Sequence, residues 1–113
     1  MDAAIKSRWV EALRSGEYKQ CQGKMHNGVG FCCMGVVCDV ELDDWWIASK
    51  VSGLGWSIGL GPDEKRLLDG ISRLPGWFLN AIDLEWVEQC KLIAMNDQDY
   101  TFDEIADWIE VNL

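Results

Sequence analysis

Basic residues and long apolar runs are scarce in this chain, and each shortage excludes a class of function. Ten Lys and Arg stand against 19 Asp and Glu, which gives a net charge of −9. Because proteins neutralise nucleic-acid phosphates with Lys and Arg, this balance argues against direct nucleic-acid binding. No apolar run reaches the roughly 18–20 residues that a transmembrane helix requires, so no membrane partner is expected. The N-terminus also lacks the apolar stretch of a signal peptide, which predicts a cytoplasmic protein.

Catalytic motifs are missing as well. The chain contains neither a Gly-x-Ser-x-Gly nucleophile elbow nor a Ser-x-x-Lys motif. Its only histidine is His26, although a cysteine nucleophile needs a nearby base and zinc sites commonly use several His or paired Cys ligands. We therefore expect a protein that is not an enzyme and that holds no cofactor or metal.

The cysteines are odd in number, two are adjacent, and most lie among apolar residues. They are Cys21, Cys32, Cys33, Cys38 and Cys90. Free cysteine in a cytosolic protein usually behaves as a small buried hydrophobe, and a secreted disulfide framework would more often show an even count. Cys21 could approach Cys33 across a hairpin, so a zinc-binding or thiol-dependent protein stays open as an alternative.

The length and the 49% hydrophobic content predict a single globular domain over residues 1–113. We expect an α+β fold that is mostly helical, with a small antiparallel β-hairpin at about residues 18–33. The hairpin rests on Asn27-Gly28, because Asn-Gly between two strand candidates is the strongest short hairpin signal. Helices are expected over residues 2–15, 34–42, 62–74, 81–95 and from Thr101 to the C-terminus, with a hint of a strand at 56–60. In the first helix, the spacing of Ile5, Trp9 and Leu13 predicts one inner face.

The last helix has the clearest start and the clearest charge pattern. Thr101 and Glu104 fit a capping box, in which each side chain bonds the backbone N–H of the other residue. Asp103, Asp107 and Glu110 recur at helical spacing on the outer face. Residues 83–113 hold nine acids and one lysine, so this third of the chain is expected to attract a basic protein surface.

Four of the seven tryptophans, Trp45, Trp46, Trp56 and Trp77, fall in irregular regions, where aromatic side chains commonly form binding sites. Trp45 and Trp46 are accordingly predicted to contact a protein partner together with the acidic helix. An alternative is a nucleotide-like ligand, whose base would stack on Trp45, Trp46 or Trp56. Its phosphate would lie at the start of the following helix, where the candidate residues are Gly59, Gly61, Lys65 and Arg66.

Three blocks of the sequence resemble a family of small proteins encoded by bacteriophages and prophages. They are Trp-Val-Glu-Ala-Leu-Arg-Ser-Gly-Glu-Tyr-Lys-Gln (9–20), Phe-Cys-Cys-Met-Gly-Val-Val-Cys-Asp (31–39) and the Asn-Asp…Phe-Asp-Glu-Ile-Ala-Asp-Trp-Ile-Glu segment (96–110). The chain departs from the family pattern at Cys21, at Asp99-Tyr100 and over residues 43–94. The resemblance implies a phage origin and a small accessory protein, and it implies no activity.

These observations lead to one main hypothesis and two alternatives. The main hypothesis is a phage-encoded, non-catalytic inhibitor that binds a host protein with a basic surface, for example a component of a CRISPR defence complex. The first alternative is a protein that sequesters a nucleotide-like small molecule. The second is the zinc-binding or thiol-dependent protein.

Overall fold

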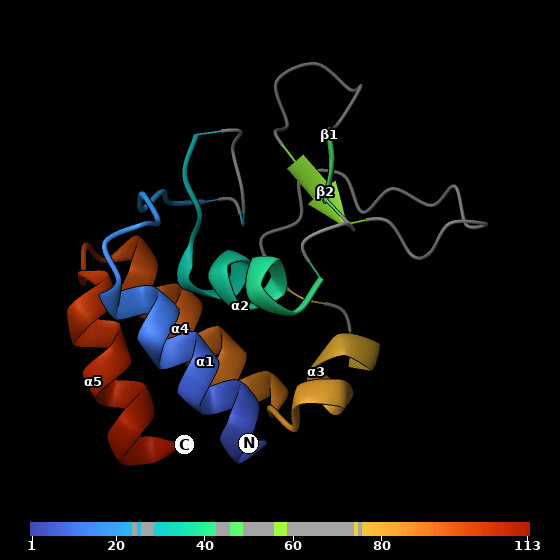
Figure 1. The fold of residues 1–113 in the computed structure, drawn as a ribbon. Helices are drawn as coiled ribbons and strands as arrows, with labels where there is room; N and C mark the ends of the chain where they lie inside the picture. The colour runs from blue at the N-terminus through green and yellow to red at the C-terminus, as the bar shows by residue number, and fades with distance from the viewer. Residues whose placement is uncertain (24, 26–28, 43–45, 49–55, 59–73, 75) are drawn as a thin grey trace.

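The computed structural model describes residues 1–23, 25, 29–42, 46–48, 56–58, 74 and 76–113 (Figure 1). These residues form five α-helices and two three-residue β-strands. The helices are α1 (Ala3–Arg14), α2 (Cys33–Leu42), α3 (Gly76–Ile82), α4 (Trp86–Asp97) and α5 (Phe102–Asn112), and the strands are β1 (Trp46–Ala48) and β2 (Trp56–Ile58).

The predicted α+β class is wrong, because helices make up the packed body and the fold is all-α. The two strands form an antiparallel ribbon in which Ile47 pairs with Ser57, and this ribbon is too small to change the class. The ribbon is formed by residues 46–48 and 56–58, whereas the hairpin was expected at about residues 18–33.

The expected hairpin at residues 18–33 is absent from the described part of that stretch. Gln20 and Phe31 form instead an isolated bridge between parallel segments, with Phe31 N–H donating to the Lys19 carbonyl at 2.8 Å. Met25 is fully buried, and its carbonyl accepts a hydrogen bond from Cys32 N–H at 3.0 Å. Met25, which lies between the two segments, thus packs into the core.

Helices α1 and α5 lie side by side and antiparallel, with both chain ends at the same end of the pair (Figure 1). The α1 helix starts at the N-cap Asp2, whose carboxylate accepts a hydrogen bond from Ile5 N–H at 2.9 Å. It buries Trp9 and Leu13, which confirms the inner face predicted from their spacing. The capping box of α5 is confirmed as well, because Thr101 Oγ1 accepts from Glu104 N–H and Glu104 Oε1 accepts from Thr101 N–H.

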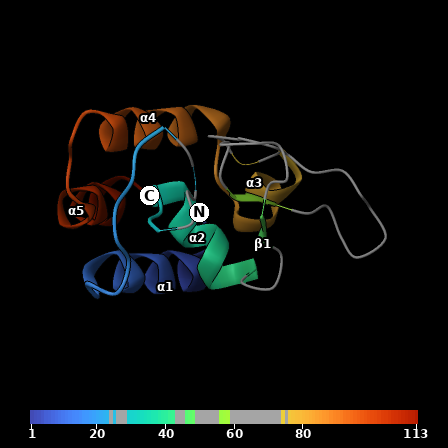
Figure 2. The same ribbon diagram turned by 90° about the horizontal axis from the view of Figure 1, so that it is seen from above.

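Helix α2 lies between α1 and α4, as the view from above shows (Figure 2). Its first six residues are mostly fully buried, and among them Met34, Val36 and Val37 have no exposed surface. A helix covered on several sides needs apolar residues all round its circumference, which explains why this segment shows no helical periodicity. Within the described part of the chain, no helix is both long and apolar enough to span a bilayer.

Candidate functional site

The three sequence blocks that carry the family resemblance meet around α2, where their polar groups bond to one another. Trp9 Nε1–H donates to the Cys33 carbonyl at 2.9 Å in the buried core. The fully buried Asn96 accepts from Gln20 Nε2 at 2.9 Å and from Cys33 N–H at 3.3 Å, and donates to the Cys21 carbonyl at 2.8 Å. Because these side chains satisfy each other inside the protein, the motif residues build the frame and do not form an open site.

Gly35 in the middle block is required by close packing. A Cβ atom at this position would overlap the carbonyl oxygen of Met25 and would lie 2.8 Å from its carbonyl carbon. The backbone of Met25 therefore passes directly over Gly35, and only a residue without a side chain allows that approach. This part of the motif is explained by backbone packing.

The cysteines of the same block are buried free thiols. Burial raises the pKa of Cys32 to about 12 and that of Cys38 to about 12, and it raises the pKa of Cys33 well above its usual value. All three thiols are protonated at neutral pH, whereas nucleophilic attack and metal binding need the thiolate. Across the residues that the structure describes, no three Cys, His, Asp or Glu side chains gather as a metal site would require.

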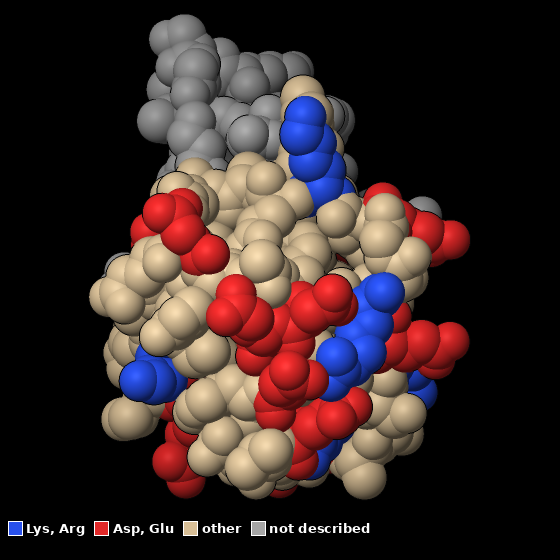
Figure 3. Space-filling view, turned by 90° about the vertical axis from the view of Figure 1, so that its left-hand side faces the viewer, with Lys and Arg blue, Asp and Glu red and all other residues tan. Residues whose placement is uncertain are grey.

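The three acids predicted on α5 do share one face, and α1 partly neutralises two of them. Arg14 Nη2 lies 2.6 Å from Asp107 Oδ1 and 3.3 Å from Glu110 Oε2. Asp107 and Glu110 still expose 69% and 53% of their side chains, and Asp103 is exposed with no ion pair among the described residues. Figure 3 shows acidic side chains gathered over this face, with basic ones beside them. Arg14 is the functional neighbour that the sequence reasoning missed.

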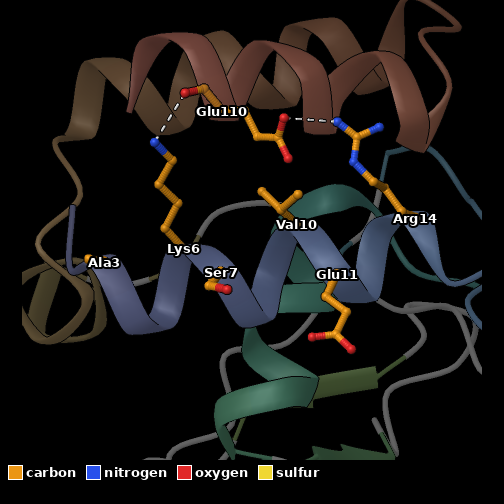
Figure 4. A pocket seen from close by; sticks show the side chains of 7 residues that line it. All are labelled: Ala3, Lys6, Ser7, Val10, Glu11, Arg14 and Glu110. Carbon is orange, nitrogen blue, oxygen red and sulfur yellow. Dashed lines mark hydrogen bonds and ion pairs between the residues drawn. The ribbon is translucent and has the colours of Figure 1, made fainter.

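A groove of about 490 Å³ separates α1 from α5, and Figure 4 shows it from close by. Val10 lies at its base, and both of its basic side chains already bind α5. Lys6 Nζ donates to the Glu110 carbonyl at 3.2 Å, and Arg14 pairs with the Glu110 carboxylate. Since both side chains already bond to α5, the groove is a helix seam bridged by the Lys6 hydrogen bond and by the ion pairs of Arg14.

A second hollow, of about 430 Å³, lies between α4 and α5 and combines apolar and acidic groups. Met95 and the half-buried Trp108 line it, together with the acids Glu104 and Asp107. Glu104, Trp108 and Val111 form a row on α5 beside the row of Asp103, Asp107 and Glu110, because residues three and four apart share a helix face.

Exposed apolar side chains surround this hollow and continue along α4. Tyr100 is 41% exposed and Val111 is 83% exposed, and both line the hollow. Val87 lies on α4 at helical spacing from Lys91 and Met95 and is 74% exposed. We define the acidic–aromatic face as the two α5 rows plus Tyr100 and Val87. In the sequence, the signal for this face was the helical spacing of Glu104, Trp108 and Val111, which the prediction of Asp103, Asp107 and Glu110 did not include.

Of the residues predicted for the nucleotide alternative, the structure describes only the backbones of Trp46 and Trp56. Trp46 lies in β1 and Trp56 in β2, where their backbones pair with Ile58 and Ala48, respectively. The other predicted ligand residues lie outside the described residues: Trp45, Gly59, Gly61, Lys65 and Arg66. Trp45 was also predicted to contact a protein partner, so that prediction lies outside the described residues too.

The fold and the site together define a small helical protein with buried thiols and an acidic–aromatic face. Over residues 1–113 the chain matches the family model of a domain of unknown function, DUF8296, and it belongs to that family. No curated protein and no solved structure matches the chain.

Proposed function

We propose that the chain is a phage-encoded, non-catalytic accessory protein that binds and inhibits a host protein with a basic surface in the host cytosol. The observation that carries the proposal is the exposed acidic row of Asp103, Asp107 and Glu110 on α5, next to exposed apolar side chains. The phage origin and a target in a defence system, such as a CRISPR complex, come from the sequence resemblance.

Charge on this scale favours binding to a basic partner in two ways. The third of the chain that forms α4 and α5 holds nine acids and one lysine, so its field attracts a positive surface and accelerates association. The apolar side chains on the same face supply contact area that excludes water once the partner has docked. An interface of this kind combines long-range attraction with local packing.

The non-catalytic part of the proposal is supported by the chemistry of the described residues. The thiols of the middle block are protonated and enclosed, so they are poor nucleophiles. Trp9 and Asn96, which bond to the Cys33 backbone, make their hydrogen bonds to the backbone and to Gln20 inside the protein. Neither arrangement presents a reactive group to a substrate.

Two variants that neutralise opposite charges of the same ion pairs test the proposal. In the first, Asp103→Asn, Asp107→Asn and Glu110→Gln remove three negative charges while keeping the side-chain shapes. In the second, Arg14→Gln removes the cation that pairs with Asp107 and Glu110 and leaves all the acids in place. Both variants lose the same ion pairs, so a purely structural effect would change them alike.

The measurement is quantitative affinity capture from host lysate at low and high salt, followed by titration of the captured protein in purified form. We expect the triple variant to bind at least tenfold more weakly, with a flatter salt dependence, because the exposed acids contribute through long-range charge. Arg14→Gln should bind the same protein at least as tightly as the unaltered chain. Equal losses in the two variants, or no loss in the triple variant, would refute an acidic interface.

A further inference from the structure

We infer that the hollow between α4 and α5 is a subsite for an arginine side chain that the basic partner inserts. This inference rests on the proposed function and names the chemical group that the acidic–aromatic face recognises. The hollow has a volume of about 430 Å³, offers apolar surface at Met95 and Trp108, and carries two carboxylates on its α5 side. Such a mixed lining suits a side chain that has an apolar stem and a planar cationic head.

The two carboxylates each keep one oxygen available. Glu104 Oε1 accepts a hydrogen bond from Thr101 N–H in the capping box, and Asp107 Oδ1 accepts from Arg14. For the second oxygens, Glu104 Oε2 and Asp107 Oδ2, the described part of the chain supplies no hydrogen-bond donor. The internal bonds fix the positions of both groups, while the remaining oxygens can accept N–H groups from a guanidinium.

The aromatic and apolar lining favours arginine over lysine. Trp108 is half-buried in the hollow, and the walls include Tyr100 and Val111. A guanidinium is planar and weakly hydrated, so it stacks on an indole face and donates to two carboxylates at once. An ammonium group is compact and strongly hydrated, so its transfer out of water costs more free energy.

The charges of the whole hollow decide between the possible occupants. Lys91 on the α4 side is its one cation among the lining residues, and it opposes Glu104 and Asp107 on α5. A second copy of this chain would bring a net charge of −9 to a surface that is itself acidic. Charge complementarity therefore selects a basic partner, and Lys91 lowers the affinity for the incoming cation.

The probes are three octapeptides in which four glycines alternate with four copies of one other residue. That residue is arginine in the first peptide, lysine in the second and citrulline, the neutral analogue of arginine, in the third. The full chain is labelled with 5-fluorotryptophan, and its fluorine NMR resonances are followed during each titration. Trp108→Phe assigns the Trp108 resonance. We expect the arginine peptide to shift this resonance, the lysine peptide to bind at least threefold more weakly, and the citrulline peptide to leave it unchanged.

Two single variants change the hollow in opposite directions. Glu104→Gln keeps the capping box, since glutamine also serves at this position, but removes the charge, so the arginine peptide should bind about threefold more weakly. Lys91→Gln removes the repelling cation and should strengthen binding about twofold. Asp103→Asn, outside the lining of the hollow, is the matched control and should change peptide binding less than Glu104→Gln does.

The results separate this inference from the proposed function. Equal shifts with the arginine and citrulline peptides, equal affinities for the arginine and lysine peptides, or a Trp108 resonance that does not move would overturn the arginine subsite. If Asp103→Asn combined with Glu110→Gln weakens capture of the host protein while Glu104→Gln and Trp108→Phe leave it unchanged, the acidic interface stands without the subsite. If none of these variants weakens capture of the host protein, both the acidic interface and the arginine subsite are refuted.

Discussion

Substituting Gly35 by alanine is the most direct test of how the middle sequence block works. The added methyl group would overlap the carbonyl oxygen of Met25, so the backbone of Met25 has to move. That carbonyl accepts the hydrogen bond from Cys32 N–H, and the Met25 side chain is fully buried. The substitution therefore affects one hydrogen bond and one large core side chain together.

The expected destabilisation follows from three contributions. Displacing a fully buried methionine costs about 2 kcal/mol of hydrophobic burial. Losing the hydrogen bond to Met25 costs about 1 kcal/mol. Alanine is a better helix former than glycine by about 1 kcal/mol, which acts in the opposite direction because Gly35 lies inside α2. The free energy of unfolding should thus fall by about 2 kcal/mol, a large share of the ~5–15 kcal/mol typical of a domain.

Urea unfolding monitored by circular dichroism measures this change, and Gly76→Ala provides the control. Gly76 begins α3, and a Cβ atom there would meet no atom within 4 Å. The control should be neutral or stabilising by up to about 1 kcal/mol, since alanine reduces the freedom of the unfolded chain. A Gly35→Ala protein within about 0.5 kcal/mol of the unaltered chain would show that the segment at Met25 yields without cost.

Three further predictions concern the buried polar and thiol groups. Asn96→Leu should destabilise the protein by about 3 kcal/mol in the same urea assay, because it removes a fully buried amide that bonds Cys33 N–H, the Cys21 carbonyl and Gln20; a loss below 1 kcal/mol would contradict this role. The free energy of unfolding should fall as the pH rises from about 9 toward 12, by about 1.4 kcal/mol per pH unit for each of Cys32 and Cys38. The reason is that folding raises the pKa of each thiol from 9.0 to about 12, so the unfolded chain releases the proton first. Urea titrations that give the same stability over this pH range would exclude this effect. Ellman's reagent at pH 8 should leave Cys32, Cys33 and Cys38 unmodified until urea is added, as mass spectrometry of the labelled protein can verify; rapid labelling of all three in the native protein would show that they are accessible.

Local signals were sufficient for the helices whose ends are fixed by their own residues. The capping box at Thr101 and Glu104 and the spacing of Trp9 and Leu13 gave α5 and the buried face of α1 correctly, because caps and faces depend on neighbours within a turn or two. Helix α2 was placed one residue late, at 34, since a segment buried on most sides carries no periodic signal.

The hairpin prediction failed because its decisive contacts come from distant parts of the chain. Asn27-Gly28 suggested a turn, but Gln20 and Gln22 donate to α4 and its end, at Asn96 and Asp99, and do not pair across a hairpin. These partners lie more than 70 residues away, so nothing in the local pattern could reveal them.

The sequence by itself determined the charge of the α4–α5 region, the helical spacing of Asp103, Asp107 and Glu110, and the burial of the cysteine-rich block. Each of these follows from composition or from a period of three to four residues. Only the tertiary structure decided that Arg14 would neutralise part of the acidic row and that Glu104 and Trp108 would line a hollow with α4. The reason is physical: which charges meet, and which apolar side chains remain uncovered, depends on how helices pack against one another.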